Sequence, residues 1–293
     1  MAAHLELKRA KIWLPFYYPN HSNYVKQSLT RFSDSHFPSR SGTLRFGGLY
    51  PNLAAGNNGA LKRVGVKGVE IRKPEQLQSV TALIIPGGES TTMAKLAEYH
   101  NLFPALRDFV KMGNPVWGTC AGLIFLADKA IGQKLGGQEL IGGLNCTVHR
   151  NFFGSQIQSF EAEISVPEIV AKEGGPPSFR GVFIRAPGIL EVGPEVQVLA
   201  EISAPSHTSA KSDSAPESLE ENAGSEKKVI VAVKQGNLLA TAFHPELTAD
   251  TRWHSYFLKM VNETSQEAST STSLLPSEDL ILSKKPKYDL PII

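Results

Sequence analysis

Chemistry is most strongly indicated around Cys120, which lies in the sequence Gly118-Thr119-Cys120-Ala121-Gly122. This G-x-nucleophile-x-G pattern, between a short apolar run and an apolar helix, is typical of a nucleophile elbow with cysteine in place of serine. Glycines permit the sharp turn, the helix start favours a thiolate, and the Ala121 N–H can stabilise an oxyanion. An isolated cysteine is more often a small buried hydrophobic residue, but this context favours a nucleophile.

A thiolate nucleophile needs a base and a group that orients the base. The sequence Phe243-His244-Pro245-Glu246 supplies a histidine and a carboxylate directly after a predicted strand. Because Pro245 stiffens the turn, the imidazole and the carboxylate can approach each other. Taken alone, this short sequence also fits a surface histidine beside a solvated glutamate. Combined with the elbow, the order Cys120, His244, Glu246 predicts a catalytic triad.

Other polar residues follow predicted strands. In Pro86-Gly87-Gly88-Glu89-Ser90, adjacent glycines leave backbone N–H groups free to face a ligand, although a plain tight turn fits equally well. Arg150 and Arg185 have the chemistry to clamp a substrate carboxylate, whereas a solvated surface arginine is the commoner case. The sequence has no phosphate-binding loop, no G-x-G-x-x-G and no metal-ligand spacing, so neither a nucleotide nor a metal is expected.

Short apolar runs and amphipathic segments must position these residues. Strands are expected at residues 64–71, 82–85, 115–117, 160–166, 182–184, 196–202, 229–233 and 238–243. Helices are expected at residues 73–77, 91–97 with Ser90 as the cap, 103–112, 123–127 and 251–261. Strands that alternate with helices predict a parallel α/β sheet.

Composition limits the classes of protein that remain. The chain has 293 residues and a formal net charge of +2, without a run of apolar residues long enough to span a membrane. Two cysteines cannot form a disulfide scaffold and no secretory signal is present, so a reducing, cytoplasmic location is expected. The small net charge argues against nucleic acid as a partner, although residues 1–63 hold nine basic and two acidic side chains.

Three segments differ from the body of the chain. Residues 1–59 lack a sustained hydrophobic period and are interpreted as an atypical, disordered head. Residues 203–228 are rich in Ser and acids and are interpreted as a disordered insert in a hairpin that would join Ile202 to Val229. Residues 262–293 are interpreted as a disordered tail, which leaves one domain at residues 60–261.

The motifs PGGEST, GTCAGL, VHRNFFG, GVFIRAP and FHPELT, in this order, resemble the glutaminase subunit of pyridoxal 5′-phosphate synthase. This is the Pdx2/PdxT/Sno family of class I triad glutamine amidotransferases. The resemblance implies a three-layer, flavodoxin-like fold with a mostly parallel sheet. Together with the Ser-rich insert and the long tail, the chain looks like a plant member.

The resemblance also implies roles. Cys120 would attack the carboxamide of L-glutamine, with His244 shuttling the proton and Glu246 orienting His244. The oxyanion hole would use backbone N–H groups of Gly88 and Ala121. The implied glutamine-binding residues are Gly88, Glu89, Ser90, Arg150, Ile184 and Arg185. Ammonia would pass to a separate (β/α)₈ synthase subunit, and the glutaminase step would need no metal or organic cofactor.

The N-terminal part departs from the family. Members begin with a strand of the type VGVLALQG, interior to the sheet, and no counterpart is evident in residues 1–59. The head is therefore interpreted as an alternative exon or gene-model error, as a transit peptide, or as the mark of an isoform. Two other functions follow as alternatives: a catalytically impaired subunit that binds or regulates the synthase, and a γ-glutamyl peptidase.

Overall fold

A ten-stranded sheet forms the centre of the fold in the computed structural model, which describes residues 46–49, 51–132, 137–154, 159–203 and 228–272. Its strands are β1 (Phe46–Leu49), β2 (Gly68–Ile71), β3 (Ala82–Ile85), β4 (Val116–Thr119), β5 (Ala127–Ile131), β6 (Leu144–His149), β9 (Gly188–Val192), β10 (Gln197–Ser203), β11 (Lys228–Gln235) and β12 (Leu238–Thr241). Strands β7 (Ser159–Ser165) and β8 (Ser178–Ile184) form a separate antiparallel pair.

The strand order is β2-β1-β3-β4-β12-β11-β9-β6-β5, with β10 paired to β11. Strands β2, β1, β3, β4 and β12 run parallel to one another, whereas β12, β11, β9 and β6 pair antiparallel. The predicted α/β fold is confirmed, and the predicted hairpin pairs Ile202 with Val229. Apart from this hairpin, the sequence did not indicate the antiparallel pairing of β12, β11, β9 and β6.

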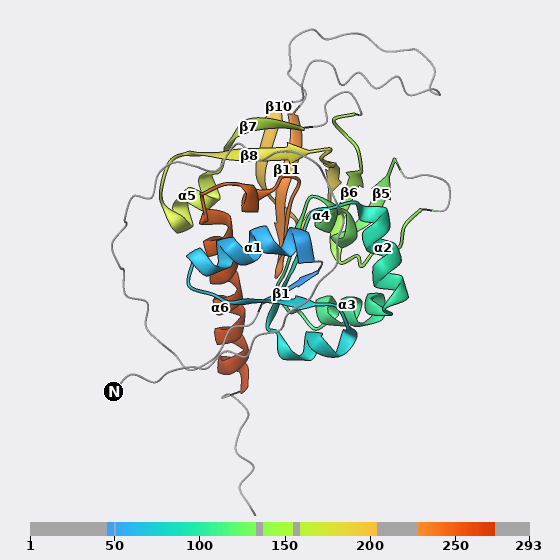
Figure 1. Ribbon diagram of the computed structural model, residues 1–293. Helices are drawn as coiled ribbons and strands as arrows, with labels where there is room; N and C mark the ends of the chain where they lie inside the picture. The colour runs from blue at the N-terminus through green and yellow to red at the C-terminus, as the bar shows by residue number, and fades with distance from the viewer. Residues whose placement is uncertain (1–45, 50, 133–136, 155–158, 204–227, 273–293) are drawn as a thin grey trace, which may run out of the picture.

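Helices cover both faces of the sheet. They are α1 (Pro51–Arg63), α2 (Ser90–Tyr99), α3 (Leu102–Lys111), α4 (Ala121–Leu126), α5 (Pro167–Glu173) and α6 (Arg252–Thr272), with 3₁₀ turns η1 (Pro74–Ser79) and η2 (Pro245–Leu247). Figure 1 shows α1 and α6 on one side of the sheet and α2 and α3 on the other. This arrangement gives three layers, as expected for an α/β sandwich.

Strand β1 corrects the prediction that the interior first strand is missing. It lies between β2 and β3 and runs parallel to both, with Gly47 opposite Val69 and Leu83. Helix α1 follows, so residues 46–49 and 51–59 belong to the folded domain and not to a head without structure. The prediction failed because the run FGGL shows neither the continuous apolar character nor the alternation by which a strand is recognised.

Helix α6 corrects the other boundary. It continues to Thr272, so residues 262–272 are helical and do not belong to a disordered tail. The remaining predictions of disorder, for residues 1–45, 204–227 and 273–293, lie outside the described residues.

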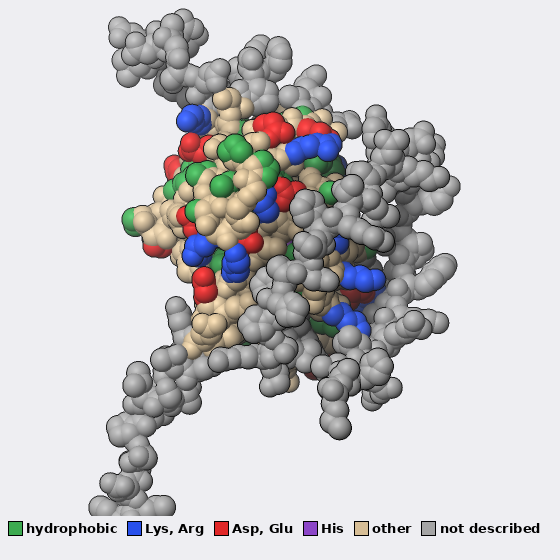
Figure 2. All heavy atoms as spheres, turned by 90° about the vertical axis from the view of Figure 1, so that its left-hand side faces the viewer, with side chains coloured by type: hydrophobic (Ala, Val, Ile, Leu, Met, Phe, Trp, Pro, Cys, Tyr) green, Lys and Arg blue, Asp and Glu red, His purple; other side chains and the backbone are tan. Residues whose placement is uncertain are grey.

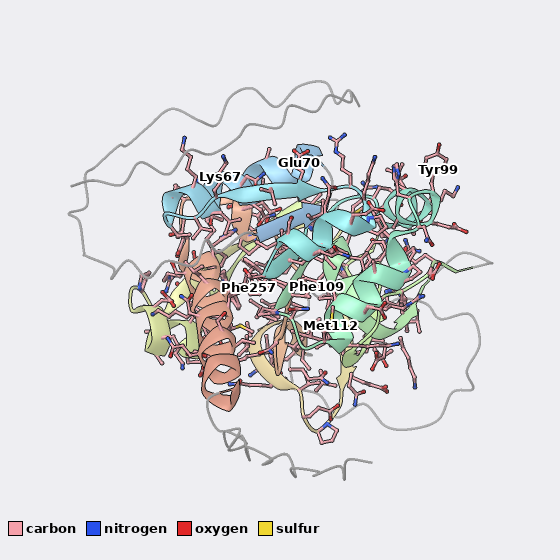
Figure 3. All side chains as sticks on the ribbon, turned by 90° about the horizontal axis from the view of Figure 1, so that it is seen from below. Lys67, Glu70, Tyr99, Phe109, Met112 and Phe257 are labelled. Atoms are coloured by element: carbon pink, nitrogen blue, oxygen red, sulfur yellow. The ribbon has the colours of Figure 1, made fainter. Side chains whose placement is uncertain are left out.

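The strands that carry the candidate site run through the buried core. All four residues of β3, β4 and β12 are buried, which explains why these short strands are apolar except for the threonines that end β4 and β12. Figure 3 shows Phe109 from α3 and Phe257 from α6 directed towards the interior, whereas Tyr99 and Lys67 lie at the periphery. The exposed fractions agree, because Phe109 is 3% and Phe257 0% exposed while Tyr99 is 82% exposed.

The outer face of α6 carries ion pairs with α5. Lys259 lies 3.0 Å from Glu173, and Lys172 lies 3.8 Å from Glu263. Figure 2 views this side of the molecule and shows acidic and basic side chains interspersed with apolar ones. The Lys172–Glu263 pair is exposed on both sides and contributes about 0–1 kcal/mol, whereas the Glu173 carboxylate that Lys259 contacts is only 8% exposed. No described helix combines the length and apolar character needed to cross a membrane.

A buried polar contact joins α1 to α6. Asn57 Oδ1 lies 3.0 Å from His254 Nε2, and the two residues are 3% and 0% exposed. The His254 ring also packs edge-on against Trp117 of β4, at 4.9 Å between centroids. Burial, with a smaller contribution from the Arg63 charge, lowers the pKa of His254 to about 3, so the ring is neutral. Helix α1 is thus attached to the core by a hydrogen bond between neutral groups.

We expect Asn57→Ala to lower the free energy of unfolding by about 1–3 kcal/mol, because His254 would lose its partner while buried. Urea unfolding measures this change. Asn58→Ala is the matched control, since Asn58 is the next residue of the same helix and is only half-buried. Equal losses for the two variants would contradict the assigned importance of the Asn57–His254 bond.

Candidate active site

Cys120 lies in a sharp turn between β4 and α4. Its backbone has φ 50° and ψ −102°, a strained conformation for a residue with a side chain, and its N–H donates to the Thr241 carbonyl at 2.7 Å. Glycines on both sides make this turn possible. A Cβ at Gly118 would overlap the backbone of Gly122, and a Cβ at Gly122 would overlap the Ile85 carbonyl oxygen of β3. The predicted elbow is therefore present, followed by a helix of only 6 residues.

We expect Gly122→Ala to destabilise the chain by about 1–3 kcal/mol and to lower any activity of Cys120, because the added methyl group must displace the β3 backbone. Urea unfolding measures the first effect. Gly59→Ala in α1 is the control, since its Cβ would have no neighbour closer than 3.9 Å. Helix propensity predicts that this control is slightly stabilising. A neutral effect of Gly122→Ala would contradict the tight packing inferred for the elbow.

His244 and Glu246 meet beside this turn. The Nδ1 atom of His244 lies 2.8 Å from Glu246 Oε1, and the two side chains are only 7% and 3% exposed. His244 ends the segment after β12, where its N–H donates to the Val182 carbonyl of β8 at 2.9 Å. Since the Glu246 carboxylate accepts a hydrogen bond from the Nδ1–H of His244, the other ring nitrogen, Nε2, is left for Cys120.

The charges around His244 favour its protonated form. Burial lowers the pKa of the imidazole, but the Cys120 thiolate, through its charge and a hydrogen bond, and the Glu246 carboxylate outweigh burial and raise the pKa to about 10. An imidazolium held between two anionic groups is the arrangement of an activated cysteine. The three residues can therefore supply a nucleophile and a proton donor.

Two glycines let the backbone approach the triad closely. A Cβ at Gly87 would overlap His244 Cε1 and come within 3.1 Å of Cys120 Cβ. A Cβ at Gly56 of α1 would lie 2.9 Å from Glu246 Cγ. The triad is therefore enclosed by the loop after β3 and by α1. Helix α1, which the N-terminal part of the chain forms, thus lies against the catalytic residues.

Glu89, Ser90 and Arg150 form a second group near the start of α2. Glu89, not Ser90 as predicted, caps the helix: its carboxylate accepts from Thr91 N at 3.2 Å and from Thr92 N at 2.7 Å. Burial alone would raise the Glu89 pKa, but the hydrogen bonds from Thr92 and Thr91 hold it below its ordinary value. The Ser90 hydroxyl instead accepts a hydrogen bond from the Arg150 guanidinium.

Arg150 reaches this group from the end of β6. Its Nη2 also donates to Thr91 Oγ1 at 3.2 Å. Burial lowers the pKa of Arg150, with the Glu89 charge acting in the opposite direction. Since the ordinary pKa of a guanidinium lies far above neutrality, Arg150 remains a cation that can bind a carboxylate.

The remaining predicted residues lie around Cys120. The Ile184 carbonyl oxygen lies 3.8 Å from Cys120 Sγ, and Arg185, which follows it, has the unusual φ of 44°. Gly88 has φ 154° and follows Gly87, which contacts the triad. Ala121 directly follows Cys120 and begins α4. The structure thus brings all the predicted site residues to the ends of β3, β4, β6, β8 and β12.

Sequence reasoning missed two side chains of the site and assigned the wrong role to a third residue. Gly87 was expected to offer its N–H group to a ligand, but that group donates to Thr119 Oγ1 at 3.0 Å. Thr119 and Thr91 were not considered as side chains of the site. Thr91 is the last residue of the PGGEST motif and could have been recognised from it, whereas the sequence around Thr119 does not indicate that its hydroxyl accepts a hydrogen bond.

Among the described residues, no group of His, Cys, Asp and Glu side chains could hold a metal ion.

Comparison with known proteins identifies the family. The sequence profile of the SNO glutamine amidotransferase family matches residues 55–263. A probable pyridoxal 5′-phosphate synthase subunit PDX2 from Arabidopsis thaliana is 73% identical over 214 residues, which cover 73% of this chain and 84% of that protein. The pyridoxal 5′-phosphate synthase subunit PdxT of Moorella thermoacetica is 45% identical, over 69% of this chain and 90% of that protein.

Solved structures agree with the sequence matches. A crystal structure of a glutamine amidotransferase is 38% identical with a TM-score of 0.58, and the match covers 74% of this chain and 98% of that one. A putative GMP synthase subunit from Thermoplasma acidophilum, at 13% identity and a TM-score of 0.50, shares the fold, over 78% of this chain and 100% of that one. On the evidence of the profile and of these relatives, the chain is a member of the SNO glutamine amidotransferase family.

Proposed function

We propose that this chain is the glutaminase subunit of a pyridoxal 5′-phosphate synthase. It would hydrolyse L-glutamine to L-glutamate and ammonia, with Cys120, His244 and Glu246 as the catalytic triad. The observation that carries the proposal is the buried His244–Glu246 bond of 2.8 Å beside the strained Cys120. The names of the relatives from Arabidopsis thaliana and Moorella thermoacetica support the assignment to this synthase.

The first half of the reaction forms a thioester. The Cys120 thiolate attacks the carboxamide carbon of glutamine, and the carbonyl oxygen becomes an oxyanion that the N–H groups of Gly88 and Ala121 stabilise. The His244 imidazolium donates its proton to the carboxamide nitrogen. The C–N bond then breaks, ammonia leaves, and Cys120 carries a γ-glutamyl group.

The second half restores the enzyme. Neutral His244 takes a proton from water, and the resulting hydroxide attacks the thioester carbon. The C–S bond breaks, glutamate leaves, and the Cys120 thiolate again faces an imidazolium. Glu246 keeps the Nδ1 proton of His244 in place throughout, which directs Nε2 towards the reacting atoms.

The other predicted residues would hold glutamine. Arg150, fixed by Ser90 and Thr91, offers a guanidinium to the α-carboxylate. Backbone groups of Gly88, Glu89, Ile184 and Arg185 line the approach to Cys120. The carboxylate of Glu89 caps α2, so we assign its contribution to its backbone and not to its side chain.

Ammonia would pass to a (β/α)₈ synthase subunit, and the complex would work in the cytoplasm.

The alternative of a catalytically impaired regulatory subunit is not favoured. It was motivated by the absence of the first strand, and β1 occupies the place of that strand. No metal or organic cofactor enters the proposed glutaminase step.

The test is glutamate release from L-glutamine by the purified chain mixed with the (β/α)₈ synthase subunit. We expect release that depends on both proteins and on Cys120. Co-purification of the two proteins without glutamate release, and without labelling of Cys120 by a diazo-ketone analogue of glutamine, would favour the regulatory alternative. Faster cleavage of γ-glutamyl peptides than of glutamine would favour a peptidase.

A further inference from the structure

Thr119 is the last residue of β4 and directly precedes the nucleophile. It is 0% exposed and lies opposite Thr241 of β12 in the parallel register. Its hydroxyl oxygen accepts a hydrogen bond from Gly87 N at 3.0 Å. This bond joins the strand that carries Cys120 to the loop after β3, which is the loop that carries Gly88.

Gly87 is in contact with two members of the triad. A Cβ at this residue would overlap His244 Cε1 and come within 3.1 Å of Cys120 Cβ. The backbone of Gly87 therefore has little room to move towards the triad. Its N–H bond to Thr119 holds the loop at the same residue.

We propose that Thr119 is a positioning residue of the glutaminase site, whose hydroxyl fixes Gly87 and thereby the direction of the next N–H group, that of Gly88. This inference rests on the proposed glutaminase function, in which Gly88 stabilises the oxyanion. Thr119 touches no reacting atom and acts through the loop alone. The threonine side chain suits this task because its β-branch is stiff and its hydroxyl is a compact acceptor.

Removal of the hydroxyl would leave the buried Gly87 N–H without its acceptor. The loop would then rearrange, and Gly88 would move away from the oxyanion. Since an oxyanion donor acts mainly in the transition state, its displacement lowers kcat more than it changes KM. We expect Thr119→Val to lower kcat by about tenfold to a hundredfold, with a change in KM of less than about threefold.

The experiment measures glutamate release by Thr119→Val and Thr119→Ser chains mixed with the synthase subunit. Thr119→Ser keeps the hydroxyl, so we expect its kcat within about threefold of that of the unsubstituted chain. Thr241→Val is the comparison for the loss of a buried hydroxyl that does not bind Gly87, and we expect a smaller fall in kcat. If Thr119→Val fails to fold, Thr119→Ala removes the same hydroxyl without adding a methyl group.

A kcat for Thr119→Val near that of the unsubstituted chain would overturn the inference. Equal losses of kcat in Thr119→Val and Thr119→Ser, or in Thr119→Val and Thr241→Val, would also overturn it, since packing alone would then explain these losses.

Hydrogen exchange of the Gly87 amide is measured in the absence of glutamine. We expect this exchange to be at least about tenfold faster in Thr119→Val than in Thr119→Ser. Absence of glutamate release by the unsubstituted complex would instead reject the proposed function, while the exchange rates would still test the Thr119–Gly87 bond.

Discussion

Replacing Cys120 with alanine is expected to abolish glutamate release, with kcat lowered by about 10⁴-fold or more. The thiolate forms and later breaks the only covalent bond between chain and substrate in the proposed reaction, so no other group can take its part. The strained turn is expected to remain, because its two glycines and the Cys120 N–H bond to Thr241 do not involve the sulfur atom. The measurement is single-turnover glutamate release in the presence of the synthase subunit.

Cys146→Ala is the matched control, because it removes the other cysteine of the chain. Cys146 is buried on β6, and burial, with a smaller contribution from the Asp128 charge, raises the pKa of its thiol to about 12. A thiol of this kind is inert at neutral pH. We expect Cys146→Ala to retain its activity and to be labelled by a diazo-ketone analogue, whereas Cys120→Ala is not labelled. Glutamate release by Cys120→Ala above about 1% of the normal rate would contradict the assigned nucleophile.

The chemistry of the site could be predicted from the sequence because each part is a local pattern at a strand end. The elbow glycines flank Cys120 within five consecutive residues, and His244 and Glu246 are two positions apart. The apolar run of β3 is buried on both faces and was recognised to the residue, whereas the strand expected at residues 115–117 lies at Val116–Thr119. Strands β3, β4 and β12 run parallel, so their carboxyl ends share one edge of the sheet, which explains why the motifs that follow these three strands converge.

The parts that escaped prediction depend on contacts between distant segments. Strand β1 is identified by its pairing with β2 and β3, not by its own composition. Helix α1 contains residues of low helix propensity, and its attachment through Asn57 and His254 spans 197 positions of the chain. The Gly87 N–H was misjudged for the same reason, since its acceptor is Thr119, 32 positions away. Such pairing and hydrogen-bond partners cannot be recognised from the local sequence.

Glu246→Gln is expected to lower kcat by about 10²- to 10⁴-fold, because the neutral amide no longer stabilises the His244 imidazolium and can bind the wrong tautomer. The Glu246 side chain is buried, so water cannot replace its charge. The variant should still fold, since glutamine has nearly the same shape and fits against Gly56 of α1. The measurement is the pH dependence of kcat/KM for glutamate release. Glu98→Gln on the exposed side of α2 is the control for loss of a carboxylate.

The direction of the pH effect follows from the causes of the His244 pKa. The Cys120 thiolate and the Glu246 carboxylate together raise this pKa to about 10, against the effect of burial. The proposed reaction starts from the thiolate–imidazolium pair, so activity falls when rising pH removes the imidazolium proton. Without the Glu246 charge the pKa falls, and the alkaline limb of the profile should move to lower pH. If the alkaline limb of the profile stays at the same pH in Glu246→Gln, Glu246 does not control the protonation of His244. If kcat is unchanged in this variant, Glu246 is not a member of the catalytic triad.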